Sequence, residues 1–126
     1  MDAPLLERRA AAAIAGITVL TGAAQMVAGG PLLSLIALSP PDLAAAHLFA
    51  TVGMFMVLFG GALLHAQRQR EALDVVLLWA SLQKLLAAAL VGWGVERGVL
   101  ASPALLVAGF DFASGLLFLD LRRRGG

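Results

Sequence analysis

Four long apolar stretches constrain this chain more than any other feature of its sequence. They cover about residues 10–28, 43–64, 73–93 and 103–121. Each supplies the roughly 20 apolar residues that a helix needs to cross a hydrocarbon core about 30 Å thick. Leu, Ala and Gly dominate the stretches, which lack the strict alternation of barrel strands, so helices are expected. The predicted fold is an all-α, integral membrane four-helix bundle that forms a single domain over residues 1–126.

The overall composition supports a membrane protein and excludes several other classes. Of the 126 residues, 60% are hydrophobic and 13% are charged, whereas soluble domains are about half apolar and about a quarter charged. The chain has no Cys, which excludes disulfides, thiol catalysis and Cys-based metal sites. Its formal net charge of +1 gives no electrostatic footprint for nucleic acid. We therefore expect the lipid bilayer, and no nucleic acid, around this chain.

Arginine residues predict the orientation of the four spans. Seven of them belong to the side that holds both termini and the loop between the second and third spans: Arg8, Arg9, Arg68, Arg70, Arg122, Arg123 and Arg124. The opposite side carries only Arg97. Since positive charge favours the cytoplasmic side, we predict an N-in/C-in topology. The Ala- and Arg-rich composition is typical of a GC-rich bacterial source, which indicates a multi-pass protein of the bacterial inner (cytoplasmic) membrane.

The first span has a second interpretation. Two arginines, an apolar run and then small residues around Gly22 are also the pattern of a secretory signal peptide with its cleavage site. We interpret the segment as a retained signal anchor that forms the first helix of the bundle.

The loop between the first and second spans contains an apolar segment that is too short to cross a membrane. Leucines and an isoleucine dominate residues 32–38, between a Gly-Gly-Pro and a Ser-Pro-Pro-Asp sequence. We expect this segment to lie in the membrane interface or to pack as a lid on the bundle. Asp42, after two prolines, is the predicted N-cap of the second span, and Ser102 is the predicted N-cap of the fourth.

Two ionisable side chains lie near the middle of spans, Lys84 in the third and Asp111 in the fourth. On an insertion scale each costs about 2.5–3.5 kcal/mol at the centre of a helix, and neither is near enough to a span end to snorkel easily. We therefore predict an ion pair between neighbouring helices, at matching depth and facing the bundle interior. Small residues at helical spacing around both, such as Ser81 and Gly115, favour a close approach of the two helices.

Other polar residues occupy the middle or the outer half of the spans. A polar stripe from Thr18 to Gln25 follows one face of the first span. His47 and Thr51 lie four residues apart in the second span, and Ser114 lies one turn from the aspartate of the fourth. We predict that Gln25, His47, Thr51 and Ser114 line a polar pocket that opens away from the cytoplasm and has the ion pair as its floor.

Three roles of the Lys84–Asp111 pair are left open by the sequence. The pair is a structural clamp that fixes helix register, or it binds a ligand such as a lipid or quinone head group or moves a proton, or it contacts a partner subunit. Haem is not expected, because His47 and His65 lie on one span roughly 27 Å apart along the helix axis and have no partner histidines elsewhere. We predict no metal, no cofactor and no catalytic residues.

The order of the spans and a few of their residues resemble a known group of proteins. The second span opens with the sequence His47-Leu48-Phe49-Ala50 and continues through Gly53 to Gly60-Gly61, while Lys84-Leu85 and Asp111 follow in the third and fourth spans. In these residues, in size and in topology, most of the chain resembles the small bacterial four-span DoxX-like and BphX-like families. The resemblance implies an accessory subunit of a membrane redox or catabolic system.

Two functional hypotheses follow from the sequence. The first is a non-catalytic accessory subunit of a larger bacterial membrane complex, redox- or energy-related, which packs against partner subunits or forms a homo-oligomer. The second is a membrane-embedded binder or carrier of a small lipophilic or anionic ligand, held in the outward-facing polar pocket. An enzyme is not expected, because the sequence shows no nucleophile–base arrangement and no phosphate-binding glycine loop.

Overall fold

Five helices make up the part of the chain that the computed structural model describes, residues 3–125. They are α1 (Ala3–Val27), α2 (Gly29–Ser34), α3 (Leu43–Ala66), α4 (Arg70–Glu96) and α5 (Ala104–Arg123). All except α2 are long and apolar enough to cross a membrane. The predicted all-α four-helix bundle of a multi-pass membrane protein is confirmed. Helices α1 and α4 begin before the predicted spans, because helical hydrogen bonding continues into the polar residues that flank the apolar stretches.

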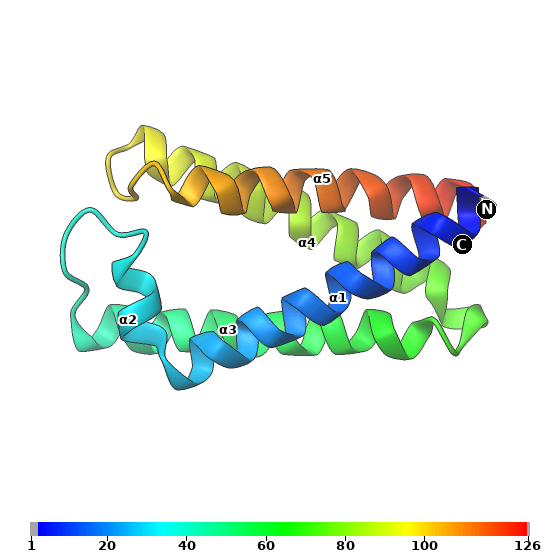
Figure 1. Ribbon diagram of the computed structural model, residues 1–126, viewed down its shortest axis with the longest axis horizontal. Helices are drawn as coiled ribbons and strands as arrows, with labels where there is room; N and C mark the ends of the chain where they lie inside the picture. The colour runs from blue at the N-terminus through cyan, green and yellow to red at the C-terminus, as the bar shows by residue number, and fades with distance from the viewer. Residues whose placement is uncertain (1–2, 126) are drawn as a thin grey trace.

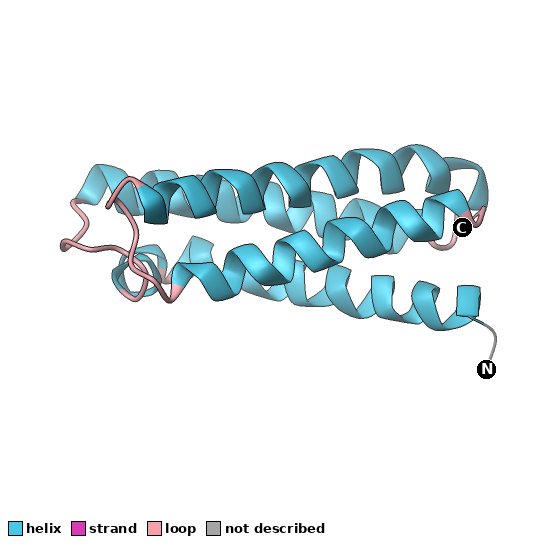
Figure 2. Cartoon of the chain, turned by 90° about the horizontal axis from the view of Figure 1, so that it is seen from above, coloured by secondary structure: helices cyan, strands magenta, loops and turns pink. Residues whose placement is uncertain are grey.

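The four long helices are arranged as two antiparallel pairs. Helix α1 packs along α3, and α4 packs along α5 (Figure 1). Both termini lie at one end of the bundle, and the two longer loops gather at the other end (Figure 2). We call the end with the termini the inner end and the opposite end the outer end, in keeping with the predicted orientation.

Helices α1 and α3 approach closely through glycine. A Cβ atom on Gly53 would lie 2.7 Å from the Cβ of Gln25, and a Cβ atom on Gly60 would lie 2.8 Å from the backbone oxygen of Ala15. Both distances are shorter than van der Waals contact, so a side chain at either position would push the helices apart. Small residues are the usual means by which membrane helices pack, because lipid removes the hydrophobic drive between them.

The apolar core occupies the inner half of the bundle and joins the two helix pairs. Its buried members come from all four long helices: Ala11, Ala15, Leu63, Ala66, Leu73, Leu77, Ala80, Phe118 and Leu121. Dispersion contacts among these side chains stabilise the inner end.

The outer half of the bundle is packed more openly. Val107 lies on the same side of α5 as the buried Asp111, one turn nearer the outer end, yet Val107 is 45% exposed and Phe110 is 39% exposed. On α1, Thr21 is exposed although it follows the buried Thr18 by one turn. The two helix pairs diverge toward the loops (Figure 1). The bundle is therefore closed at its inner end and at mid-depth, and looser beyond that.

At the outer end the two loops meet again. The backbone nitrogen of Ala101 donates a hydrogen bond to the backbone oxygen of Ile36 at 2.7 Å. Ala37 and Leu100 form an isolated antiparallel bridge beside it. This short backbone contact links the two loops, and through them the two helix pairs, at the outer end.

The segment between the first and second spans contains the short helix α2, which packs on α3. Helix α2 begins at Gly29, where a Cβ atom would lie 2.8 Å from the backbone oxygen of Ala46 on α3. The Asp42 cap is confirmed, because its carboxylate accepts a hydrogen bond from the backbone nitrogen of Ala45 at 2.7 Å. The Ser102 cap is wrong: Pro103 precedes the first residue of α5, and no side chain caps that helix.

Ion pairs fasten the helix ends at the inner surface. Arg122 of α5 pairs with Asp74 of α4 at 3.2 Å, and Arg124 pairs with Glu7 of α1 at 2.9 Å. Both pairs connect different helices at the end that holds the termini. They support the apolar core there, although exposed ion pairs each contribute little to stability.

Candidate functional site

The mid-bundle ion pair that the sequence predicts is present. Lys84 of α4 and Asp111 of α5 approach to 3.3 Å, measured from Nζ to Oδ1. Their side chains are 5% and 12% exposed, so the pair lies inside the bundle. A charged side chain at the centre of a membrane helix is costly when it is alone. Pairing across the α4–α5 contact gives each charge a partner of opposite sign.

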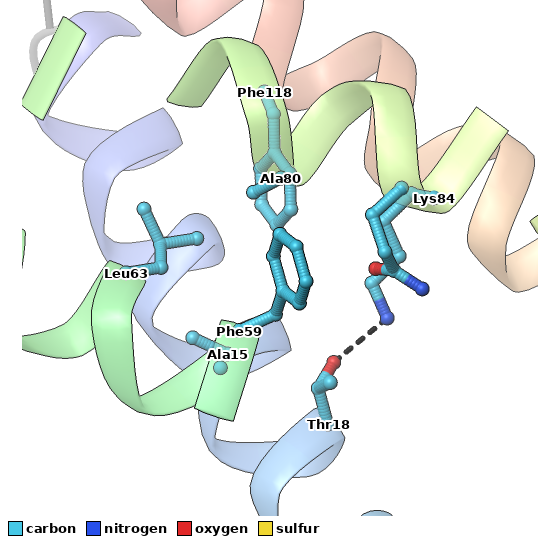
Figure 3. A pocket seen from close by; sticks show the side chains of 9 residues that line it. Ala15, Thr18, Phe59, Leu63, Ala80, Lys84 and Phe118 are labelled. Atoms are coloured by element: carbon cyan, nitrogen blue, oxygen red, sulfur yellow. Dashed lines mark hydrogen bonds between the residues drawn. The ribbon is translucent and has the colours of Figure 1, made fainter. Parts of the chain in front are cut away.

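A third residue, Thr18 of α1, completes the site. The ammonium of Lys84 donates a hydrogen bond to Thr18 Oγ1 at 2.8 Å (Figure 3). The Thr18 hydroxyl in turn donates to the backbone oxygen of Ile14 at 2.9 Å, so its lone pairs are free to face the lysine. The lysine therefore bridges both helix pairs, with one bond to α5 and one to α1. We call these three residues the polar node.

Thr18 was not among the predicted site residues, although the sequence contains a signal for it. Thr18 belongs to the polar stripe of the first span and lies near the middle of α1, at about the depth of Lys84 in α4. Matching polar residues by depth across all spans would have selected it. Phe110 is a second contact of Lys84 that was not predicted. The Lys84 ammonium lies 5.6 Å from the centre of the Phe110 ring, within the range of a cation–π contact.

Small residues let α4 and α5 approach around the polar node. A Cβ atom on Gly115 would lie 3.2 Å from the backbone oxygen of Ser81, and nearer still to the Leu85 side chain. Ser81 is fully buried and donates a hydrogen bond to the backbone oxygen of Leu78 at 2.7 Å. The short Lys84–Asp111 contact thus rests on a helix pair that glycine and serine hold close together.

A very small cavity lies beside Lys84, on the inner side of the polar node. Its volume is about 10 Å³, and its walls include Thr18, Phe59, Gln83 and Phe118 (Figure 3). This volume is about what a single water molecule needs. It is far below the several hundred Å³ of a pocket for an organic ligand.

The four residues predicted to line an outward-facing pocket do not converge on the polar node. Gln25 is buried and donates a hydrogen bond to the backbone oxygen of Phe49 on α3 at 3.1 Å. Thr51 donates to the backbone oxygen of His47 at 3.1 Å, within its own helix. His47 is exposed in the outer half of α3. Only Ser114, buried one turn from the aspartate, lies next to the predicted floor.

The reason for this difference is the way the helices pair. Because α1 packs along α3 through glycine, the face of Gln25 turns toward α3 instead of the bundle axis. The outer half of α3 then presents His47 to the surroundings. The sequence gives the depth of each polar residue, but it does not say which two helices pair most closely.

The polar node brings together one ammonium, one carboxylate and one hydroxyl group. Among residues 3–125 no three His, Asp or Glu side chains come together as a possible metal site. His47 and His65 are both exposed, near opposite ends of α3. What the polar node does physically is tie three helices at one depth: α4 to α5 by an ion pair and α4 to α1 by a hydrogen bond.

Comparisons with protein-family models, with curated proteins and with solved structures found no match to this chain.

Proposed function

We propose that this chain is a non-catalytic accessory subunit of a larger membrane complex, redox- or energy-related, in the bacterial inner membrane. In this proposal the protein is DoxX-like in role, and its four helices serve as a scaffold that partner subunits pack against. The polar node acts as the clamp that sets the register of the scaffold.

The observation that carries the proposal is a notch on the side of the α1–α3 pair. Gly60 contacts Ala15, and the residues that follow them, Gly61 and Gly16, have no atom within 4 Å of the place where a Cβ would stand. In two antiparallel helices in contact, the next residue on each turns toward the same side of the pair. Gly16 and Gly61 therefore open the same side at the same depth.

Glycine in a helix interior costs about 0.5–1 kcal/mol relative to alanine when nothing requires it. Gly22, Gly53, Gly60 and Gly115 are required by contacts within this chain. Gly16 and Gly61 are not required by any contact among the described residues. In membrane proteins, small residues usually allow another helix to approach closely. A partner helix seated on Gly16 and Gly61 would give them that use.

The alternative function, a binder or carrier of a lipophilic or anionic ligand, has less support. The cavity beside Lys84 holds about 10 Å³, and the ammonium is already engaged by Thr18 and Asp111. A quinone or lipid head group would have to displace one of these contacts.

Cysteine cross-linking tests the proposal directly, because the chain contains no natural cysteine. Gly61→Cys is labelled with a photoactivatable maleimide in native membranes, and Leu106→Cys on the exposed face of α5 is the control. We expect Gly61→Cys to cross-link to one defined, different polypeptide in stoichiometric yield, and Leu106→Cys to label lipid. Cross-linking of Gly61→Cys only to lipid or to a second copy of this chain would contradict a larger hetero-complex.

A second variant tests whether the notch itself is used. Gly61→Leu fills the notch, whereas Ala62→Leu places the same side chain one position along the same helix, at an exposed residue. We expect Gly61→Leu to release the chain from its complex and Ala62→Leu to leave the complex intact. Equal retention of both variants would exclude the notch as the contact.

A further inference from the structure

Six of the seven arginines at the inner end fall into two groups. Three are paired with carboxylates: Arg122 with Asp74, Arg123 with Asp120, and Arg124 with both Glu7 and Asp120. Three others form no ion pair within residues 3–125: Arg8, Arg9 and Arg68. The arginines of the α5 end are therefore neutralised, whereas Arg8, Arg9 and Arg68 have no ion-pair partner among residues 3–125.

Arg8 is held partly inside the bundle in spite of its charge. Its spacing from Ala11 and Ala15 places it on the buried face of α1. Its Nε atom is inaccessible and, alone among the side-chain nitrogens and oxygens of the described residues, is buried without a hydrogen-bond partner. A buried guanidinium nitrogen without an acceptor is costly. The described residues therefore do not satisfy the charge of Arg8, and an anion at the accessible part of its guanidinium group would be favourable.

A hydrogen bond brings the third arginine to the same place. The side-chain amide of Gln67 donates to the backbone oxygen of Arg8 at 3.2 Å. This contact holds the α3–α4 turn against the first turns of α1, and Arg68 is the next residue of that turn. Arg9 and Arg68 are both exposed. The three arginines thus come from two segments that meet at one corner of the inner surface.

We propose that Arg8, Arg9 and Arg68 bind the phosphate group of an anionic phospholipid. Guanidinium presents parallel donors that match the oxygens of a phosphate. The corner lies where the apolar run of α1 begins, which is the depth of lipid head groups. The nearest carboxylate in sequence, Glu7, is engaged by Arg124 and does not compete for the three arginines. Anionic lipids also provide the negative surface that attracts such clusters.

Lipid retention measured by native mass spectrometry tests the site. The delipidated protein is titrated in a neutral detergent with phosphatidylglycerol, with phosphatidylcholine of the same acyl chains, and with inorganic phosphate. We expect one phosphatidylglycerol to bind at least about tenfold more tightly than phosphatidylcholine, and millimolar inorganic phosphate to leave it bound. Equal binding of the two lipids would overturn the proposal. Displacement by phosphate alone would also overturn it, because the ligand would then be the free anion.

Matched variants separate a site from a general positive surface. Arg9→Gln and Arg123→Gln each remove one exposed arginine. Arg123 is paired with Asp120, which keeps Arg124 as a partner when Arg123 is lost. We expect Arg9→Gln to weaken phosphatidylglycerol binding about fivefold and Arg123→Gln to change it less than about twofold. Equal losses in the two variants would show a diffuse field instead of a site. Since Arg9 is exposed, this comparison does not depend on replacing the partly buried Arg8.

Discussion

Separating the two charges of the polar node should destabilise the bundle far more than removing both. In Asp111→Leu the ammonium of Lys84 keeps Thr18 but loses its counter-ion in a side chain that is only 5% exposed. A lone charge at the centre of a membrane helix costs about 2.5–3.5 kcal/mol, and breaking a buried pair costs about 3–5 kcal/mol. We expect a loss of about 3 kcal/mol in the free energy of unfolding. Lys84→Met leaves the Asp111 carboxylate without its counter-ion and should lower the free energy of unfolding by about the same amount.

The double variant Lys84→Met/Asp111→Leu is the decisive member of the series. Replacing a buried ion pair by apolar side chains of similar volume is often neutral or stabilising, so the double variant should lie within about 1 kcal/mol of the unmodified protein. The coupling energy is the loss in the double variant minus the two single losses, so it should be about 5–6 kcal/mol in magnitude, above the range of about 0.5–3 kcal/mol that is usual for residues in contact.

Reversible unfolding in mixed micelles, with increasing sodium dodecyl sulfate and detection by far-UV circular dichroism, measures these free energies. Leu86→Ala and Leu116→Ala are controls on the exposed faces of the same two helices, and each should change stability by less than about 0.5 kcal/mol. Single-variant losses that add, with a coupling below about 0.5 kcal/mol, would refute the assignment of Lys84 and Asp111 as one energetic unit.

The same unfolding assay checks three further predictions. Gly53→Ala places a Cβ 2.7 Å from a side chain of α1 and should cost about 1–3 kcal/mol. Gly92→Ala meets open space and should be neutral or stabilising by up to about 1 kcal/mol. Equal effects of the two variants would contradict the α1–α3 contact. Thr18→Val removes the acceptor of the lysine and should cost about 1–3 kcal/mol, most of which Thr18→Ser should restore, so an unrescued loss would point to packing. Phe118→Ala should cost about 3–5 kcal/mol, while the exposed Phe112→Ala should cost less than about 0.5 kcal/mol; similar losses would place the core elsewhere.

The sequence predicts those features of this protein that follow directly from the cost of placing backbone groups and charges in lipid. Four apolar runs of spanning length become four helices, because backbone groups in lipid must bond within their own helix. Lys84 and Asp111 pair for a similar reason, since each charge at mid-depth needs the other. Asp42 caps its helix because a carboxylate after two prolines has a local partner three residues on.

The sequence does not predict features that depend on which helices pair most closely. Gln25 bonds to α3, and Thr18 bonds to Lys84, because the α1–α3 contact turns one polar stripe toward two different neighbours. His47 is exposed for the same reason. The glycines of the first two spans indicate that these helices approach closely. The sequence does not distinguish Gly53 and Gly60, which contact α1, from Gly16 and Gly61, which have no neighbour within 4 Å of a Cβ position.

Native mass spectrometry on the protein released from its own membrane in mild detergent tests the proposed function most directly. We expect the protein to be released in a complex of fixed stoichiometry with larger, different subunits. The Gly61→Leu variant should be lost from this complex, and the Ala62→Leu variant should remain in it. A monomer or small homo-oligomer in the unmodified protein would contradict an accessory role. If such a species kept a small organic mass that Lys84→Leu or Asp111→Asn failed to retain, the polar node would be a ligand site instead of a clamp.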